Sequence, residues 1–370
     1  MPDRFLVNAV GAVVEIDVSR RTADFRARAF DAWADARHEG DRAPDAVAVV
    51  PEGTDDAAAL SALSTEVTLK ALAHRRHDRV WMLHAAGLAA HDGRVVVLSA
   101  ASGTGKTTAA RHLSQRYAYV SDETIGIDDT GRVVPYRKPL SIIEQGSAPK
   151  AQVALSSIDD DRVLPAELRV AKIVVIDRSV DGPEEPEVEA LDIAEALALL
   201  GPQTSYLADG PRPLHRIAAL LAATGGAVRV RYREVSRIDG VIDELLRTPL
   251  RPVEIVPPTV SRPLAAAPQP GELIRAEVID ELVLDGRTVL LRRTPTGGQV
   301  HVLDGIGPAI WSAVAEGYPL ERIVEAVVAL HGEPEGLDAR AVVDAAVQRL
   351  LADGILRASE APASSDVIPS

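Results

Sequence analysis

One stretch of this 370-residue chain constrains its fold more than any other. An apolar run from Val95 to Leu98 leads into SAASGTGKTTAARHL, which has the composition of a glycine-rich turn followed by a helix. A strand that ends in such a turn and continues as a helix is the architecture of a phosphate-binding loop. The stretch therefore predicts an α/β domain that binds nucleotide phosphates.

The glycine-rich loop assigns a chemical role to several positions. Gly103 and Gly105 allow backbone amides to face an anion, while Lys106 reaches the outer phosphates. Thr107 supplies a hydroxyl ligand for Mg²⁺, so ATP and Mg²⁺ are the predicted cofactors. The usual pattern begins with glycine six positions before the lysine, where this chain has Ala100. The predicted nucleotide-binding residues are Ser102, Gly103, Thr104, Gly105, Lys106, Thr107 and Thr108.

Titratable residues on both sides of the loop indicate a reaction. Asp122 and Glu123 follow the strand-like AYVS after the loop, and His84 ends a strand before it. The carboxyl ends of neighbouring strands meet at one edge of a sheet, so we expect these acids beside the phosphates. Asp122 can then orient or deprotonate a hydroxyl while Glu123 holds the metal. The alternatives are a solvated turn for the acids and a hydrogen-bonded core histidine for His84.

Two later segments carry charges that suit phosphoryl transfer. PYRKPLSI contains Arg137 and Lys138, and IVVIDR ends in Asp177 and Arg178. Their cations can stabilise transition-state oxygens or an acidic substrate group, with ordinary surface pairing as the alternative. IVVIDR also has the character of a Walker B strand, in which case Asp177 replaces Glu123 as the metal-binding carboxylate. The predicted catalytic residues are His84, Lys106, Asp122, Lys138 and Arg178.

Composition excludes several classes of function. The chain has no cysteine, which removes disulfides, thiolate nucleophiles and Cys-ligated metal sites and fits a reducing cytoplasm. Its net charge of -14 disfavours general binding to nucleic acid. No run approaches the ~18 apolar residues of a membrane span. We therefore expect a cytoplasmic protein with neither nucleic acid nor membrane as a partner.

A proline-rich segment divides the chain. Residues 256–271 contain five prolines without apolar periodicity and are expected to form a spacer. Residues 1–255 alternate strand-like and helical patterns, and residues 1–78 are expected to form a strand-rich N-terminal subdomain. Residues 272–358 show strands first and helices after, which predicts a small α+β domain. Residues 359–370 are small and polar and are expected to be disordered.

Hydrophobic periodicity predicts individual elements of the first region. Apolar residues recur at helical spacing within Asp56–Arg75 and again within Ile193–Leu200. Arginines alternate with apolar residues from Ala227 to Val235, which predicts the solvated face of an edge strand, with a basic binding stripe as the alternative. The other predicted strands are 6–16, 46–50, 79–83, 94–98, 118–120 and 170–176.

The order of these parts resembles the bacterial HPr kinase/phosphorylase superfamily. In that family a histidine-containing strand, a hairpin, the phosphate loop and a short strand ending in paired acids follow one another. His84 in LHAAG, the loop GTGKT, and Asp122 with Glu123, where the family usually has two aspartates, match over roughly residues 80–180. PYRKPLSI and IVVIDR look like segments of HPr-kinase-related proteins found beside peptide-modification systems. The resemblance implies a P-loop kinase domain of HPr-kinase-like type.

Residues 271–357 resemble the PqqD-like family, whose winged-helix domains recognise leader peptides. The best local match is GGQVHVLDGIGPAIWSAV. The resemblance implies that a leader adds a strand to the domain and packs beside its last helix. The alternatives are a domain that docks only onto its own kinase and an inherited DNA-binding fold. The implied peptide-binding residues are Gln299, Val300, His301, Val302 and Leu303 on the strand, with Val342, Ala345 and Arg349 on the helix.

Together the two regions predict an ATP-dependent kinase that docks a ribosomally synthesised precursor peptide by its leader and phosphorylates a hydroxyl of the tethered core. Tethering raises the effective acceptor concentration to the order of millimolar. Two other functions stay open. One is a nucleotide-gated protein that delivers the peptide to other modifying enzymes. The other is a small-molecule kinase whose C-terminal domain is regulatory or forms a homo-oligomer.

Overall fold

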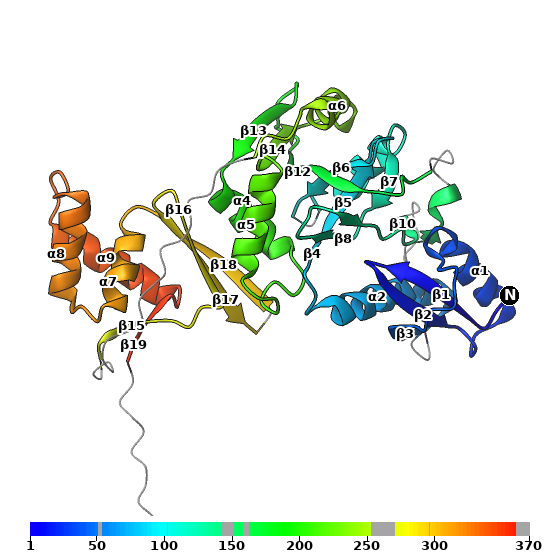
Figure 1. Ribbon diagram of the computed structural model, residues 1–370, viewed down its shortest axis with the longest axis horizontal. Helices are drawn as coiled ribbons and strands as arrows, with labels where there is room; N and C mark the ends of the chain where they lie inside the picture. Colours follow the sequence, from blue (N-terminus) through cyan, green and yellow to red (C-terminus); the bar gives the residue numbers. More distant parts are fainter. Residues whose placement is uncertain are drawn as a thin grey trace, which may run out of the picture. The chain divides into compact units, whose positions relative to one another are not determined.

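The computed structural model describes residues 1–50, 54–101, 103–142, 151–157, 163–252, 271–295 and 297–359. These residues form a mixed α/β structure with several sheets and nine α-helices (Figure 1). The expected spacer up to residue 270 and the expected tail from residue 360 lie outside the described residues. Within the described parts, no helix is both long and apolar enough to cross a membrane.

The chain divides into two compact units. The first comprises Met1–Glu254 with Pro295–Gly298, and the second comprises Ile255–Thr294 with Gln299–Ser370. The first unit contains the glycine-rich loop and both acids, and the second contains the predicted peptide-binding strand from Gln299 onward. Each unit is built around hydrophobic clusters of its own.

Among the first 78 residues, those that the structure describes form a three-stranded sheet with two α-helices (Figure 1). The expected single strand over residues 6–16 is wrong, because Val10 (φ +50°) and Gly11 (φ +80°) turn the chain into a hairpin. The expected helix over Asp56–Arg75 is confirmed, and it packs on the sheet. The elements are β1 (Arg4–Ala9), β2 (Ala12–Asp17), α1 (Ala23–Ala32), β3 (Ala46–Val49) and α2 (Asp56–Arg75).

A six-stranded sheet forms the centre of the first unit. In sheet order its strands are β13 (Glu187–Leu191), β14 (Ala227–Tyr232), β12 (Arg169–Arg178), β6 (Arg94–Ser99), β5 (Ala85–Ala89) and β7 (Ala118–Ser121). β14, β12 and β6 run parallel, whereas β13 and β5 are antiparallel to their neighbours. β14 is therefore internal, which corrects the expected edge strand. Its Arg229 and Arg231 lie 2.9 and 3.3 Å from Glu189 of β13.

Helices cover this sheet because its strands are apolar on both faces. α3 (Lys106–Leu113) and α6 (Asp239–Arg247) pack against Leu98 and Val174 on one face. Val97 points to the opposite face of β6 and is also fully buried. The remaining helices of the unit are α4 (Ile193–Leu200), as expected, and α5 (Pro213–Ala223).

Short strands complete the first unit around the carboxyl end of β7. A three-stranded antiparallel sheet has the order β4, β8, β9, and β10 pairs antiparallel with β11 in a separate two-stranded sheet. The strands are β4 (Val80–Leu83), β8 (Ile125–Asp128), β9 (Val133–Val134), β10 (Leu140–Ile142) and β11 (Ala151–Val153).

The second unit places strands before helices, as the sequence predicts, except for its last strand. β19 follows the helices and pairs with β15 at the start of the unit. In Figure 1 the helices α7, α8 and α9 lie grouped together, and β16, β17 and β18 form a sheet with β18 at one edge. The strands are β15 (Leu273–Arg275), β16 (Asp280–Leu284), β17 (Arg287–Thr294), β18 (Gly297–Leu303) and β19 (Leu356–Ala358). The helices are α7 (Gly307–Ala315), α8 (Leu320–His331) and α9 (Ala339–Ala352).

Candidate active site

Sheet topology brings three predicted segments to one edge of the central sheet. The glycine-rich loop follows β6 and Asp122 follows β7, and these two strands are parallel because each is antiparallel to β5. Ala85 of β5 pairs with Ser99 at the end of β6, so His84 lies at the same edge. One pocket here is lined by His84, Ala101, Gly103, Gly105, Lys106, Thr107, Thr108, Asp122, Glu123, Lys138 and Ser141.

The glycine-rich loop needs its glycines for backbone conformation. Gly103 (φ +85°) and Gly105 (φ +94°) both adopt the left-handed region that side chains disfavour. Ala100 is buried and does not have a positive φ, so alanine fits where the usual pattern has glycine. α3 begins at Lys106, and its amino-terminal amides and dipole favour an anion in the pocket. Ser102 lies outside the described residues.

Lys106 is buried at the base of this pocket. Its Nζ donates a hydrogen bond to the His84 carbonyl oxygen at 3.3 Å, which leaves two further protons for an anionic ligand. Burial lowers the pKa of Lys106 to about 8, while the charges of Glu123 and Asp122 oppose that shift. The lysine is therefore charged at neutral pH but held less firmly in that state than a surface lysine.

The acid pair surrounds a buried cation. Lys138 is only 4% exposed, and its Nζ lies 3.4 Å from Glu123 Oε2 and 3.9 Å from Asp122 Oδ1. Asp122 is 7% exposed, and no donor in the part of the chain that the structure describes meets hydrogen-bond geometry at its Oδ1, although the fully buried Tyr119 hydroxyl interacts with this carboxylate. A buried oxygen without a donor costs about 1–3 kcal/mol, so this atom favours a hydroxyl or cation ligand.

The oxygen atoms of this pocket suit a magnesium ion. Mg²⁺ prefers carboxylate and hydroxyl oxygens together with substrate phosphates. Thr107, Asp122 and Glu123 supply such oxygens, and the undonated Asp122 Oδ1 fits that chemistry. The pocket thus holds side chains that fit both predicted cofactors, ATP and Mg²⁺.

His84 stands beside Glu123, with 3.6 Å between its Nδ1 and Glu123 Oε1. Burial lowers the pKa of His84, the charge of Lys106 lowers it further, and Glu123 opposes both effects. The imidazole is consequently neutral at pH 7. A neutral histidine here can hydrogen-bond a ligand or orient Glu123, and it adds no charge to the site.

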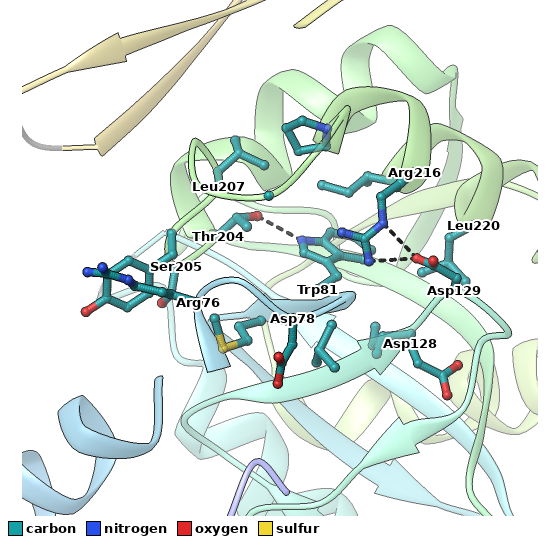
Figure 2. A pocket seen from close by; sticks show the side chains of 17 residues that line it. Arg76, Asp78, Trp81, Asp128, Asp129, Thr204, Ser205, Leu207, Arg216 and Leu220 are labelled. Atoms are coloured by element: carbon teal, nitrogen blue, oxygen red, sulfur yellow. Dashed lines mark hydrogen bonds and ion pairs between the residues drawn. The ribbon is translucent and has the colours of Figure 1, made fainter. Parts of the chain in front are cut away.

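The chain around His84 is held by residues that follow α4. The His84 amide donates to Gln203 O at 2.7 Å, and Trp81 Nε1 donates to Thr204 Oγ1 at 2.9 Å. Figure 2 shows this second bond at the wall of another pocket, where Arg216 also binds Asp129. The described lining of that pocket shares no residue with the pocket of the glycine-rich loop. The two hydrogen bonds, and not that pocket, connect the residues after α4 to the strand that ends before His84.

Arg178 and Asp177 are separated by the pleat of β12. Arg178 donates from Nε to Arg233 O at 3.1 Å, and a methyl group added to Gly105 would lie 3.7 Å from Arg178 Nη1. The guanidinium therefore lies beside the loop. Asp177 is exposed, faces the opposite side of the strand and does not line the pocket. The structure thus brings Glu123, and not Asp177, to the phosphate-binding side chains.

Two serines near the acids were not predicted. Ser121 Oγ accepts hydrogen bonds from the amides of Glu123 (3.2 Å) and Thr124 (3.3 Å) and so fixes the turn that carries the acids. Ser141 lines the pocket, and its Oγ accepts a 2.9 Å bond from Gln152 Nε2. The serine before an acidic turn is a recognisable pattern, because serine hydroxyls bond amides two residues on. Ser141 depends on the β10–β11 pairing, which its sequence does not reveal.

The second candidate site is the edge strand β18. β18 has one neighbour, β17, among the described strands, so its other side presents backbone groups for pairing. Gln299 is exposed and Leu303 is buried, whereas Val300, His301 and Val302 are half-buried. On α9, Val342 is half-buried and Ala345 and Arg349 are exposed at spacing that places all three on one face. The structure thus presents both predicted peptide-binding elements at a surface.

Comparison of the chain with protein-family models and with curated proteins finds no match. The functional argument therefore depends on the geometry. The first pocket combines an anion-binding loop, a buried lysine and a buried carboxylate at one sheet edge. That combination can bind phosphates and activate a hydroxyl group beside them.

Proposed function

We propose that this chain is an ATP-dependent kinase of HPr-kinase-like type that phosphorylates a hydroxyl of a ribosomally synthesised precursor peptide. One observation carries the proposal. The loop, Lys106 and the buried, undonated Asp122 Oδ1 line a single pocket. Nucleotide binding alone needs the loop and the lysine, whereas transfer to a hydroxyl also needs a base beside the outer phosphate.

Each side chain has a task in this reaction. The loop amides and Lys106 bind the outer phosphates, and Mg²⁺, when bound, neutralises phosphate charge next to Thr107 and Glu123. Asp122 accepts the proton of the acceptor hydroxyl while the oxygen of that hydroxyl forms a bond to the γ-phosphorus. The bond between that phosphorus and the bridging oxygen breaks, and ADP leaves. Arg178 and Lys138 offset the negative charge that spreads over the transferred group.

The second unit supplies the substrate in this proposal. It would act as a PqqD-like winged-helix domain, in which the leader pairs with β18 and contacts α9 near Arg349. Backbone pairing gives affinity and side-chain pockets give specificity. The exposed edge of β18 and the exposed face of α9 support this role. A tethered core then reaches the kinase pocket at an effective concentration on the order of millimolar.

The test is product analysis with the full-length protein. A precursor peptide encoded beside the gene is incubated with ATP and Mg²⁺, and peptide and nucleotide are measured by mass spectrometry. We expect phosphopeptide and ADP in equal amounts, and neither with Lys106→Met. Unchanged peptide that is bound only when ATP is present would overturn the proposal in favour of a delivery protein. Turnover of a small molecule without peptide would overturn it in favour of a small-molecule kinase.

A further inference from the structure

Three consecutive residues next to the kinase pocket connect that pocket to the N-terminal subdomain. Tyr136 is fully buried in the hydrophobic core of the N-terminal subdomain. Arg137 points elsewhere, with its Nη2 3.8 Å from Asp35 Oδ1 of the same subdomain. Lys138 extends into the pocket between Asp122 and Glu123. The segment that carries Lys138 is thus anchored outside the central sheet.

The anchor of Tyr136 is a buried hydrogen bond to α2. Its hydroxyl lies 3.0 Å from Thr68 Oγ1, and Thr68 itself donates to Ser64 O at 2.9 Å. Because the only proton of the Thr68 hydroxyl is used on Ser64, the Tyr136 hydroxyl is the donor of the shared bond. Burial raises the pKa of Tyr136, which keeps the phenol in the donating form. All three residues are less than 10% exposed, so water does not replace this bond.

The backbone places the anchor directly beside the acids. The Tyr136 amide donates to Val120 O of β7 at 3.3 Å, and β7 ends just before Asp122. A shift of Tyr136 therefore moves Lys138 relative to the acid pair. Lys138 depends on this placement, because a buried ammonium is stable only when its carboxylate partners are within reach.

We propose that Tyr136 and Thr68 are positioning residues of the kinase pocket, and that their hydrogen bond holds Lys138 against Asp122 and Glu123. The proposal rests on the proposed function. The N-terminal subdomain then contributes to catalysis without contacting nucleotide or acceptor. Its role is to fix Lys138, whose ammonium lies between the two carboxylates beside the phosphates.

Kinetics of matched variants test this link. Thr68→Val preserves shape but leaves the Tyr136 hydroxyl without its acceptor, so we expect kcat to fall roughly 10-fold with the KM for ATP nearly unchanged. Thr68→Ser keeps the accepting hydroxyl and should have the kcat of the wild type. In a Lys138→Met background, Thr68→Val should cause no further loss, because residues that act through one another are non-additive. An equal loss in both backgrounds would overturn the proposal.

Chemical labelling tests the same link without any catalytic readout. Reductive methylation followed by mass spectrometry measures how accessible each lysine amine is, and Lys138 should be protected in the wild type. Thr68→Val and Tyr136→Phe should each speed its labelling roughly 10-fold or more, as expected if the buried ion pair opens. Thr68→Ser should not, and the exposed Lys70 should react equally in every variant.

The labelling result separates the two proposals. Unchanged protection of Lys138 in a folded Thr68→Val protein, as judged by its thermal unfolding, would overturn the positioning role. If the wild type phosphorylates no peptide, the proposed function fails, yet the rate of Lys138 labelling still decides whether Thr68 and Tyr136 hold this lysine.

Discussion

The two candidate sites present ligand-binding groups in different ways. The pocket of the first unit is made by side chains from distant parts of the chain, and Lys106, Asp122 and Lys138 are almost completely buried. The site on β18 is made by the backbone of one strand edge, and its side chains are exposed or half-buried apart from the buried Leu303. Function of the first site therefore depends on the charges of single side chains. Binding at the second site depends on backbone donors, which most side-chain substitutions leave intact.

This contrast predicts which changes are damaging. A charge-removing substitution in the first site should lower turnover strongly while the fold persists, because the charge that develops during the reaction loses its stabilising partner. In the second site an alanine substitution should have a small effect, and only a change that removes a backbone N–H should be severe. The following experiments test these two expectations separately.

Lys106→Met should have the largest effect. The variant keeps the length of the side chain but leaves the transferring phosphate without its ammonium, so we expect turnover to fall on the order of 1,000-fold. Turnover of precursor is measured by mass spectrometry, and circular dichroism checks the fold. Lys70→Met, on the exposed surface of α2, is the matched control and should be active. Wild-type turnover by Lys106→Met would remove the loop from the catalytic machinery.

Asp122→Asn should separate chemistry from binding. The amide is nearly isosteric but cannot accept the hydroxyl proton, so turnover should fall by roughly 100-fold or more, the usual scale for a lost general base. ATP affinity, measured by calorimetry, should change little. Asp177→Asn is the control, since Asp177 is exposed and outside the pocket lining, and it should retain wild-type turnover. An equal loss of ATP affinity and turnover would make Asp122 a metal ligand or a structural residue.

Much of the first site was predictable because its local patterns agree with its topology. The strand, turn and helix around Lys106 and the acids after β7 are local features, and parallel strands bring their carboxyl ends together. Asp177 was assigned less well. Alternation along a strand predicts that Asp177 and Arg178 face opposite sides, so only one of them can reach a pocket on one face.

Other features depend on tertiary structure that the sequence pattern does not carry. β5 reads AAGLA, which is a weak strand sequence, yet β6 and β7 pair with it on both sides. The contact of Lys138 with both acids depends on Tyr136 entering the core of the N-terminal subdomain. A tyrosine between a proline and an arginine gives no indication of such burial.

Proline on β18 tests the backbone-based site. Val300→Pro or Val302→Pro removes a donor from the edge strand, so leader affinity should fall, and turnover at micromolar precursor should drop on the order of 100-fold as tethering is lost. Val300→Ala and Val302→Ala are the controls and should bind leader within a few-fold of the wild type. Fluorescence anisotropy with labelled leader measures the affinity. Unchanged leader affinity in the folded proline variants would exclude β18 as the docking strand.

The smallest predicted effect is a difference in pH dependence between the two sites: ADP binding to the first site should change with pH, and leader binding to the second should not. Burial lowers the pKa of Lys106 to about 8, so in the free protein this lysine loses its proton above that pH. Binding of ADP then requires reprotonation, and ADP affinity at pH 9 should be roughly 10-fold weaker than at pH 7. Lys106→Arg keeps its charge and should show little change. Calorimetry at both pH values measures this difference.

The contribution of Lys106 to the free energy of unfolding should rise with pH, whereas its contribution to ADP affinity should fall. Its folded pKa of about 8 lies below the unfolded value of 10.5, so the unfolded state binds more protons between these values. The free energy of unfolding of the wild type should therefore rise relative to Lys106→Met as the pH increases from 8 to 10.

Leader affinity should stay constant from pH 7 to 9, because burial lowers the pKa of His301 and the imidazole is already neutral there. Parallel pH profiles for ADP and leader would show that one titrating group controls both sites and would remove the distinction between them.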